Sequence, residues 1–469
     1  MKSPNTEPPI RQTLGFWDAV SIIVGIVVGT SIFRSSTLVF QNTSGPWHAL
    51  GAWLLGGILC LIGGLCYAEL ATTYPRNGGD YEYLGRAYGR WVGFLFGWAQ
   101  LAVILPASTG IMAYVFADYG AKLWGLAPAS TAWLAVAAVG VLSAMNLCGV
   151  MVGKSLQNVL TAAKVLGLLG IIVVGVACGQ AVHFGSAQNV AEQMDIWETT
   201  SKFGLAMVFV LYAFGGWNDA VFVAAEVRDQ SRNLPRALFV GIAGITVVYL
   251  AVNASYLAVL GFEAARATGT PATDVLAHLT GPWGANAISI LVMISALGAI
   301  NGMIFAGSRV YATVGEDHRV FALLGRWNQK ASVPAAAVMT QACIAISFVF
   351  AIGTTTGRAI IDRCLTAVGL ATLPWQKFFG GFETLLAATA PVFWTFFLLT
   401  GLSVFVLRIK DGRRQRPFRI PLYPLPPIIF SATCIYMLWC SLDYASWLAL
   451  LGVLPLLAGL PLYWLGRKS

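Results

Sequence analysis

The feature that most constrains this chain is a series of long stretches without Asp, Glu, Lys or Arg. A helix that crosses the hydrocarbon core of a bilayer needs about 20 predominantly apolar residues. Ten uncharged stretches have at least 23 residues each, which predicts ten spans: 35–68, 91–117, 123–153, 165–191, 237–262, 275–308, 331–357, 384–407, 420–442 and 444–466. Because only 10% of the residues are charged, against about 25% in soluble domains, the chain lacks the polar groups to cover a soluble surface.

Two shorter apolar runs complete the expected set of spans. They cover residues 19–33 and 203–218, and each continues as apolar, glycine-containing sequence past an interrupting charge. Counting them predicts an all-α integral membrane protein with twelve spans, in which these runs are the first and the sixth. An offset of five is expected from a five-plus-five internal repeat. Short or glycine-interrupted segments at matching positions of two halves indicate a transporter binding site.

The distribution of Lys and Arg predicts the orientation of these spans. In the twelve-span topology 21 of the 29 basic residues fall in segments on the side of the N-terminus, 7 fall on the other side, and Lys164 lies inside a span. Because loops rich in Lys and Arg stay in the cytoplasm, both termini are expected to face the cytoplasm. The protein is expected in the cell membrane, specifically a bacterial inner membrane. The net charge of +9 is therefore a topology signal and does not indicate nucleic-acid binding.

The chain is expected to divide into five segments. These are a cytoplasmic N-terminal tail (1–14), a transporter core of ten spans (15–409), a basic cytoplasmic loop (410–425), two peripheral spans (426–466) and a cytoplasmic C-terminal tail (467–469). The eight cysteines form no CxxC pair or regular spacing, and the four histidines lie in loops or at span ends. We therefore expect no disulfide framework, metal site or cofactor.

The first and sixth spans carry glycine clusters where a helix can unwind. Residues 24–33 read VGIVVGTSIF and residues 211–219 read LYAFGGWND. Non-helical backbone at membrane depth is tolerated only where it is buried in protein or lines a wet cavity, and it frees backbone N–H and C=O groups that suit a zwitterion. The alternative is that these glycines only permit close helix packing. The predicted substrate-binding residues are Val27, Gly29, Thr30, Ser31, Ile32, Tyr212, Ala213, Phe214, Gly215 and Asn218, with a carboxylate near 29–31 and an ammonium on the carbonyl oxygens around 27 and 212–214.

Three motifs in this chain resemble those of one transporter superfamily. Residues 29–33 match a GSGIF motif, residues 67–70 with 75–81 match YAEL…P-[KR]-[SN]-GGDY, and residues 215–218 with Glu226 and 232–235 match the sixth span and following loop. Over nearly its whole length the chain resembles the amino acid–polyamine–organocation (APC) superfamily, in its L-type amino acid transporter branch. The resemblance implies a LeuT-type fold of two inverted five-helix repeats with discontinuous helices 1 and 6, plus two peripheral helices.

The resemblance also carries expectations for individual residues. Tyr212 stands where the family usually has a Phe that gates the site from outside, and Ser31 replaces the second Gly of GSG. Animal members join a glycoprotein partner through a Cys in the loop between spans three and four. Residues 118–130 contain no Cys, so a disulfide-linked partner subunit is not expected; the expected partners are an amino acid substrate and the lipid bilayer.

Charged residues inside the spans are the remaining functional candidates, because such residues usually face the bundle interior. In the resembled family Lys164 takes the place where sodium-driven relatives hold sodium, so its ammonium would bridge spans one and eight, with support from Asn301. It would act as a protonation switch or as a permanently charged strut, and sodium independence follows in both cases. Asp219 would cap the second half-helix of span six, carry a proton or bind a substrate ammonium. The coupling and gating candidates are therefore Lys164, Asp219, Tyr212 and Asn301.

Two further acidic residues, Glu69 and Glu226, lie close to the predicted cytoplasmic ends of their spans. Basic residues stand near them in the sequence, so gate or structural ion pairs are expected, with Arg76, Arg228 and Arg232 as partners.

Together these features predict an alternating-access amino acid carrier, either an exchanger or proton-coupled. The Gly- and Ala-lined sixth span and the absence of a clearly pocket-facing carboxylate favour neutral amino acids of small or medium size. An Asp219 that faces the pocket would favour a cationic amino acid or a polyamine. Two alternatives belong to other classes. A polytopic membrane enzyme normally needs a His or Asp/Glu cluster at one membrane face, which the sequence lacks. A non-transporting nutrient sensor would need a signalling domain, and both tails are short.

Overall fold

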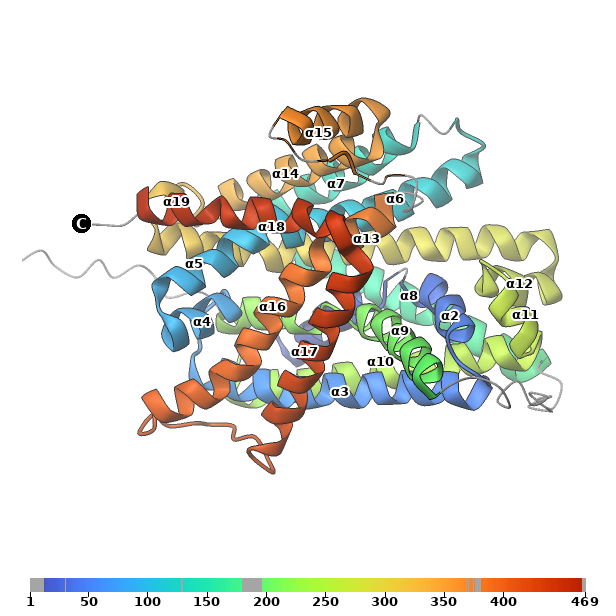
Figure 1. Cartoon of the computed structure of the whole chain (residues 1–469), viewed down its shortest axis with the longest axis horizontal. Helices are drawn as coiled ribbons and strands as arrows, with labels where there is room; N and C mark the ends of the chain where they lie inside the picture. Colours follow the sequence, from blue (N-terminus) through green and yellow to red (C-terminus); the bar gives the residue numbers. More distant parts are fainter. Residues whose placement is uncertain are drawn as a thin grey trace, which may run out of the picture.

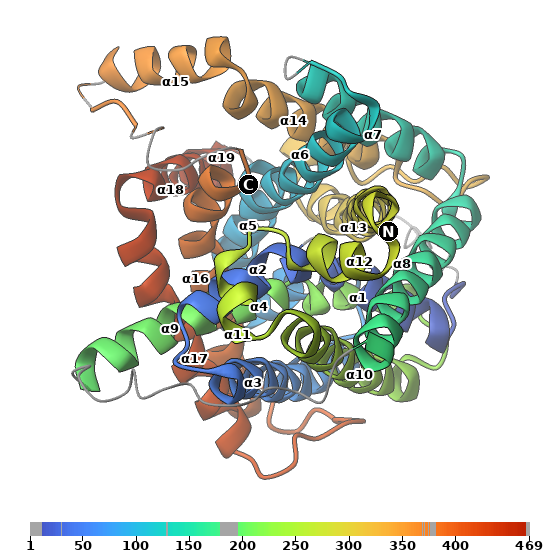
Figure 2. The same ribbon diagram turned by 90° about the vertical axis from the view of Figure 1, so that its right-hand side faces the viewer.

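The computed structural model describes residues 12–29, 31–127, 130–178, 196–367, 369, 371–373, 375 and 381–465. These residues form helices and loops, together with two isolated backbone bridges, Leu14 to Val227 and Asn328 to Val333. The long helices pack side by side into a bundle (Figure 1), and the view along the bundle shows α1 among α8, α10 and α13 (Figure 2). The all-helical fold predicted from the sequence is confirmed.

The helices follow one another with short connections. In chain order they are α1 (Phe16–Val27), α2 (Ser31–Gln41), α3 (Pro46–Thr73), α4 (Asp80–Tyr88), α5 (Arg90–Ala99), η1 (Gln100–Ile104), α6 (Leu105–Trp124), α7 (Thr131–Leu147), α8 (Val150–Cys178), α9 (Ile196–Ala213), η4 (Trp217–Glu226), α10 (Gln230–Leu260), α11 (Phe262–Ala267), α12 (Pro271–Thr280), α13 (Pro282–Asp317), η5 (Arg319–Phe321), α14 (Ala335–Gly353), α15 (Thr355–Ala367), α16 (Gly381–Lys410), α17 (Leu425–Ala445), η6 (Ser446–Ala449), α18 (Leu450–Leu457) and α19 (Gly459–Leu465).

Length and hydropathy identify most of the predicted spans. Within the described part of the chain nine helices are long and apolar enough to cross a membrane, or ten if α1 and α2 count as one bent span. Helix α7 is apolar but shorter, and 425–464 qualifies as one apolar stretch although η6 and α18 subdivide it. The count of twelve spans therefore stays a prediction.

The uncharged stretches place several helix ends wrongly. Stretch 35–68 contains the end of α2 at Gln41 and the start of α3 at Pro46, because the polar turn between them is uncharged. Helix α8 starts at Val150, well before stretch 165–191, because Lys164 lies within the helix and not at its end. A charge with a buried partner does not end a helix, so the uncharged runs are an imperfect guide to helix bounds.

Both predicted breaks are present in the backbone. Helix α1 ends at Val27 and α2 begins at Ser31, and the two helices are bent by 43°. Helix α9 ends at Ala213, a turn covers residues 214–216, and the chain continues as the 3₁₀-helix η4. Gly216 in this turn has a φ of 100°, which favours glycine. Neither helix runs unbroken through its glycine cluster.

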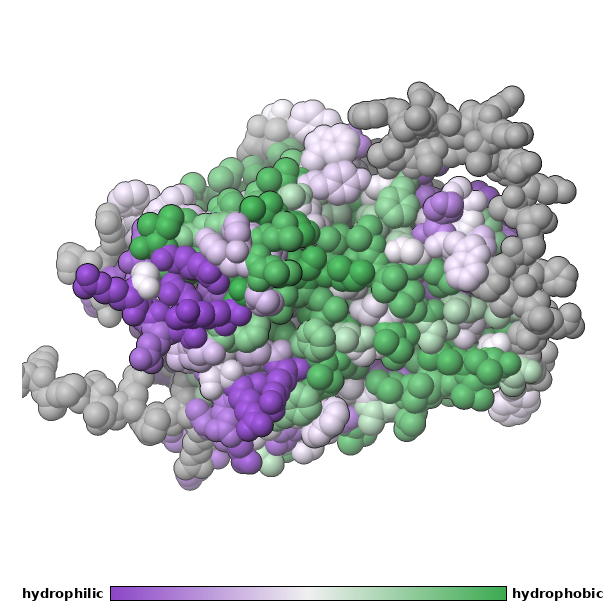
Figure 3. All heavy atoms as spheres, turned by 90° about the horizontal axis from the view of Figure 1, so that it is seen from below, coloured by the Kyte–Doolittle hydropathy of each residue, from purple (hydrophilic) through white to green (hydrophobic). Residues whose placement is uncertain are grey.

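The surface suits a bilayer. On the face in Figure 3 apolar residues cover the middle, and hydrophilic residues gather at the left-hand end, where the loop between α16 and α17 lies in Figure 1. Many large apolar side chains are exposed, among them Leu54, Val159, Val173, Phe239 and Val247. Exposed apolar side chains on this scale are typical of a surface that contacts lipid.

Candidate functional site

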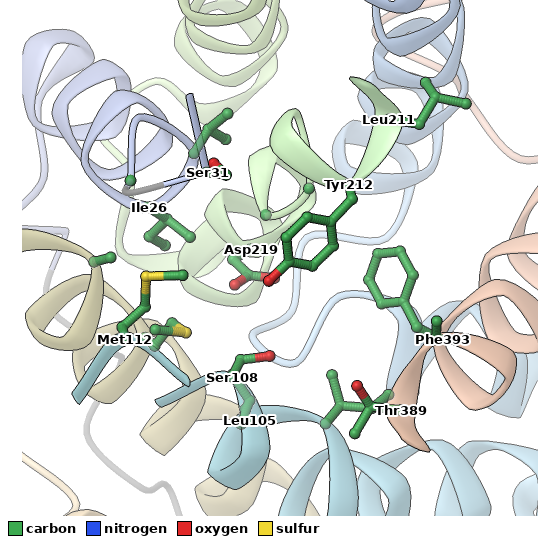
Figure 4. A pocket seen from close by; sticks show the side chains of 18 of the residues that line it. Ile26, Ser31, Leu105, Ser108, Met112, Leu211, Tyr212, Asp219, Thr389 and Phe393 are labelled. Carbon is green, nitrogen blue, oxygen red and sulfur yellow. The ribbon is translucent and has the colours of Figure 1, made fainter. Parts of the chain in front are cut away.

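A cavity of about 130 Å³, measured as the space open to the centre of a water molecule, lies at the two helix breaks (Figure 4). Residues on both sides of each break line it, together with side chains from η1, α6, α13 and α16. The lining residues are Ile26, Val27, Gly29, Ser31, Gln100, Ile104, Leu105, Ser108, Met112, Leu211, Tyr212, Gly215, Gly216, Asp219, Ala299, Met303, Thr389, Ala390, Phe393 and Trp394.

The predicted site residues divide into those that line the cavity and those that do not. Val27, Gly29, Ser31, Tyr212 and Gly215 line it, as does Asp219. Three others, Ile32, Ala213 and Phe214, are buried in the core and do not reach it. Thr30 lies outside the described residues.

The position of Asn218 corrects one prediction. Asn218 is buried and does not line the cavity, whereas its neighbour Asp219 does. The reason is the geometry of η4: a 3₁₀-helix has three residues per turn, so Gly216 and Asp219 share the face toward the cavity. Gly216 is the N-cap of η4. Among the described residues the Asp219 carboxylate accepts no hydrogen bond from the first N–H groups of η4, so the expected capping role is not observed.

The carbonyl oxygens that were expected to hold a substrate ammonium already have a partner. The hydroxyl of Tyr249 in α10 donates to the carbonyl oxygens of Val27, at 2.9 Å, and Ala213, at 3.1 Å. One buried side chain therefore joins the last residue of α1 to the last residue of α9. Tyr249 is not among the predicted site residues, because nothing in the local sequence of α10 relates it to either break.

Lys164 joins the first break to α13. Its Nζ donates to the carbonyl oxygens of Gly25, at 2.7 Å, Val28, at 2.8 Å, and Ser295, at 3.1 Å. The hydroxyl of Ser295 donates to Val28 as well, at 3.0 Å. Lys164 is fully buried and does not line the cavity. The structure thus places the ammonium between helices one and eight of the predicted topology.

Asn301 does not contact Lys164 through any hydrogen bond in the described part of the chain. Its Nδ2 donates to the side chain of Gln157 at 2.8 Å and to the carbonyl oxygen of Gly153 at 3.2 Å, and its Oδ1 accepts from Asn146. The predicted support of Lys164 by Asn301 is wrong in this geometry. Asn301 instead fastens α13 to α7 and α8.

The buried acidic residues form ion pairs with partners distant in sequence. Glu226 pairs with Arg309 of α13, with an Nε to Oε1 distance of 2.8 Å, and both side chains are almost fully buried. Glu69 pairs with Arg408, at 2.5 Å, and with Arg416, at 3.4 Å. The expected ion pairs exist, but the partners predicted from nearby sequence are wrong, because the pairing is set by packing between helices.

The loop after α3 also makes ionic contacts. Arg76 donates to both carboxylate oxygens of Asp317, at 3.0 and 2.8 Å, and the hydroxyl of Tyr81 donates to Asp317 at 2.9 Å. Burial, followed by the charge of Asp317, raises the pKa of the Tyr81 hydroxyl, so that it remains a donor. These contacts attach the loop to the end of α13.

Several lining residues come from elements that the glycine pattern could not indicate. The π-helical turn η1 precedes Pro106 in α6 and brings Gln100 and Ile104 to the cavity wall. Such turns are frequent at functional sites. Thr389 and Phe393 of α16 close another side (Figure 4). They lie in an ordinary apolar helix, and only the tertiary structure reveals them.

An apolar helical bundle with a cavity at two interrupted helices defines a membrane transporter. The solved structure of Mhp1, a nucleobase-cation-symport-1 family transporter in a closed conformation, has the same fold: the TM-score is 0.59 at 13% identity, covering 94% of this chain and 96% of that one. The amino acid permease family matches residues 14–454, and the chain belongs to this family. It is a transporter and not an enzyme.

Characterised relatives match almost the whole chain. The serine/threonine exchanger SteT of Bacillus subtilis (strain 168) is 29% identical over 98% of both chains. The human b(0,+)-type amino acid transporter 1 is 28% identical, covering 97% of this chain and 88% of that protein. The human cystine/glutamate transporter is 29% identical, covering 98% and 87%.

Proposed function

We propose that this protein carries amino acids across the cell membrane by alternating access, with the substrate bound between the two helix breaks. The observation that carries the proposal is the position of the cavity: it is lined on one side by Gly29 and Ser31 and on the other by Tyr212 and Gly215. A cavity at interrupted helices is the arrangement in which many transporters bind their substrates. The three relatives are amino acid transporters or exchangers, which supports the proposal.

The substrate carboxylate binds at the start of α2. The first N–H groups of a helix have no partner within the helix and attract an anion. Helix α2 begins at Ser31, whose side chain lines the cavity. This arrangement supports the predicted position of the carboxylate near residues 29–31.

Transport is independent of sodium. The ammonium of Lys164 already supplies a positive charge to the carbonyl oxygens of Gly25, Val28 and Ser295. A sodium ion at the same oxygens would meet a like charge at contact distance in a low-dielectric interior. The driving force is then exchange of substrates or a proton gradient.

The proposal includes the topology predicted from the sequence. Twelve spans form a five-plus-five inverted repeat with two peripheral helices, and both termini face the cytoplasm.

No disulfide-linked subunit is expected, since residues 118–130 contain no Cys. A rat relative at 28% identity is named as a small subunit, so co-purification from the native membrane is the relevant test of a partner.

Neutral amino acids were expected in part because no carboxylate was assigned to the pocket. Asp219 lines the cavity, and this position favours the alternative, a cationic amino acid or a polyamine.

Uptake of radiolabelled amino acids into liposomes that contain the purified protein tests the proposal. We expect exchange or accumulation of at least one amino acid, unchanged when choline replaces sodium. Ser31→Leu, which fills the cavity, should abolish uptake, whereas Ser347→Leu, at an exposed position of α14, should not. Binding without flux would favour the sensor, and a strict sodium requirement would contradict the role of Lys164.

A further inference from the structure

Asp219 supplies the acidic group of the cavity. It is the only Asp or Glu among the cavity-lining residues of the described chain, and no Lys, Arg or His lines the cavity. The side chain is 9% exposed, and in Figure 4 its carboxylate projects into the cavity, as does the ring of Tyr212.

Other buried carboxylates of the described structure have donors, and Asp219 does not. Glu226 and Glu69 pair with arginines, and Asp80 accepts hydrogen bonds from the hydroxyls of Tyr67 and Thr400. The backbone N–H of Asp219 donates to the carbonyl oxygen of Gly216, but its carboxylate makes no ion pair or hydrogen bond with the described residues. Since an unpaired buried carboxylate is costly, a partner from outside the chain would stabilise it.

The neighbouring charges do not neutralise Asp219. Burial and the carboxyl of Asp80 in α4 both disfavour its ionised form. Lys164 is fully buried and directs its ammonium to carbonyl oxygens of α1 and α13. A cationic group of a ligand would therefore stabilise the ionised Asp219, whereas a neutral zwitterion would leave that charge uncompensated.

We infer that Asp219 selects amino acids with a cationic side chain, such as lysine, by pairing with their distal ammonium. The inference rests on the proposed function and specifies its substrate class. The carboxylate of the ligand lies at the start of α2, and the apolar side chains of Ile104, Leu105 and Met112 surround the methylene groups between its charged ends. In this largely apolar cavity an ion pair is much stronger than in water.

The test compares L-lysine with L-serine as radiolabelled substrates in the liposome assay. Asp219→Asn should reduce the apparent affinity for lysine about ten-fold or more, because a hydrogen bond to a charged group is lost, and should leave serine affinity within about two-fold. Glu263→Gln removes one negative charge from an exposed side chain and should change neither substrate. Asp219→Glu, which keeps the charge, should retain the preference for lysine.

Each other outcome overturns the inference. Equal losses for lysine and serine would assign Asp219 to the α-ammonium. Unchanged lysine transport in a folded Asp219→Asn protein would remove Asp219 from recognition. Transport of serine but not lysine by the unmodified protein would refute the inference and leave the proposed function intact. Transport of no amino acid would overturn both.

Discussion

Replacing Tyr249 by Phe removes one hydroxyl that holds both helix breaks. The hydroxyl donates to the carbonyl oxygens of Val27 and Ala213, at 2.9 and 3.1 Å, and Tyr249 is fully buried. The substitution changes no ring contact: the ring packs against Trp53 and Phe214, with centroid distances of 5.3 and 5.1 Å, and Phe keeps both. The change therefore isolates the hydrogen bonds.

The expected loss follows from the number of bonds. A hydrogen bond contributes about 1 kcal/mol net, and a buried group left without its partner costs about 1–3 kcal/mol. The carbonyl oxygen of Val27 still accepts from the N–H of Gly29, at 2.7 Å. We therefore expect Tyr249→Phe to lower the free energy of unfolding by about 1–3 kcal/mol. Soluble-protein scaling with chain length converts this to about 1–3 °C in melting temperature.

Tyr256→Phe is the matched control, because the Tyr256 hydroxyl is buried in the same helix and has no hydrogen-bond partner among the described residues. Its removal should be neutral or slightly stabilising. Thermal unfolding of both variants in the same detergent measures the difference, and substrate affinity in the liposome assay should weaken only for Tyr249→Phe. Equal melting temperatures and equal affinities would refute the role of Tyr249 as the link between the breaks.

Three further predictions concern buried groups. Lys164→Ala should reduce the turnover of transport about ten-fold or more in a protein that still folds. Unchanged uptake kinetics would show that Lys164 has no role in coupling. Gly298→Ala should impair transport in the same way, because a Cβ there would lie 2.9 Å from the Lys164 ammonium, whereas Gly244→Ala has open space and should be silent in the same uptake assay. Glu226→Gln should destabilise the protein by about 3–5 kcal/mol, because the Arg309 guanidinium remains buried with its counter-charge removed; thermal unfolding checks this.

Local sequence predicted the features that depend on local backbone. The glycine clusters around Gly29 and Gly215 placed both breaks, because a helix without side-chain support unwinds where its propensity is weakest. The motifs of the first and sixth spans, which contain Ser31 and Tyr212, likewise predicted residues that line the cavity. The all-helical fold followed from the uncharged stretches alone.

Features set by packing between distant helices could not be predicted. Arg309 lies 83 positions from Glu226 and Tyr249 lies 36 positions from Ala213, so no periodicity connects them. Asp219 lines the cavity and Asn218 does not because η4 is a 3₁₀-helix, which shifts the face toward the cavity by one residue. An α-helical expectation for this segment could not make that distinction.

A structure of the protein solved with a bound amino acid tests the central claim most directly. The account predicts interrupted helices at Gly29 and Gly215, with the carboxylate of the ligand at the N-terminus of α2 near Ser31. Helices that continue through both glycines, or a ligand bound away from the breaks, would contradict it.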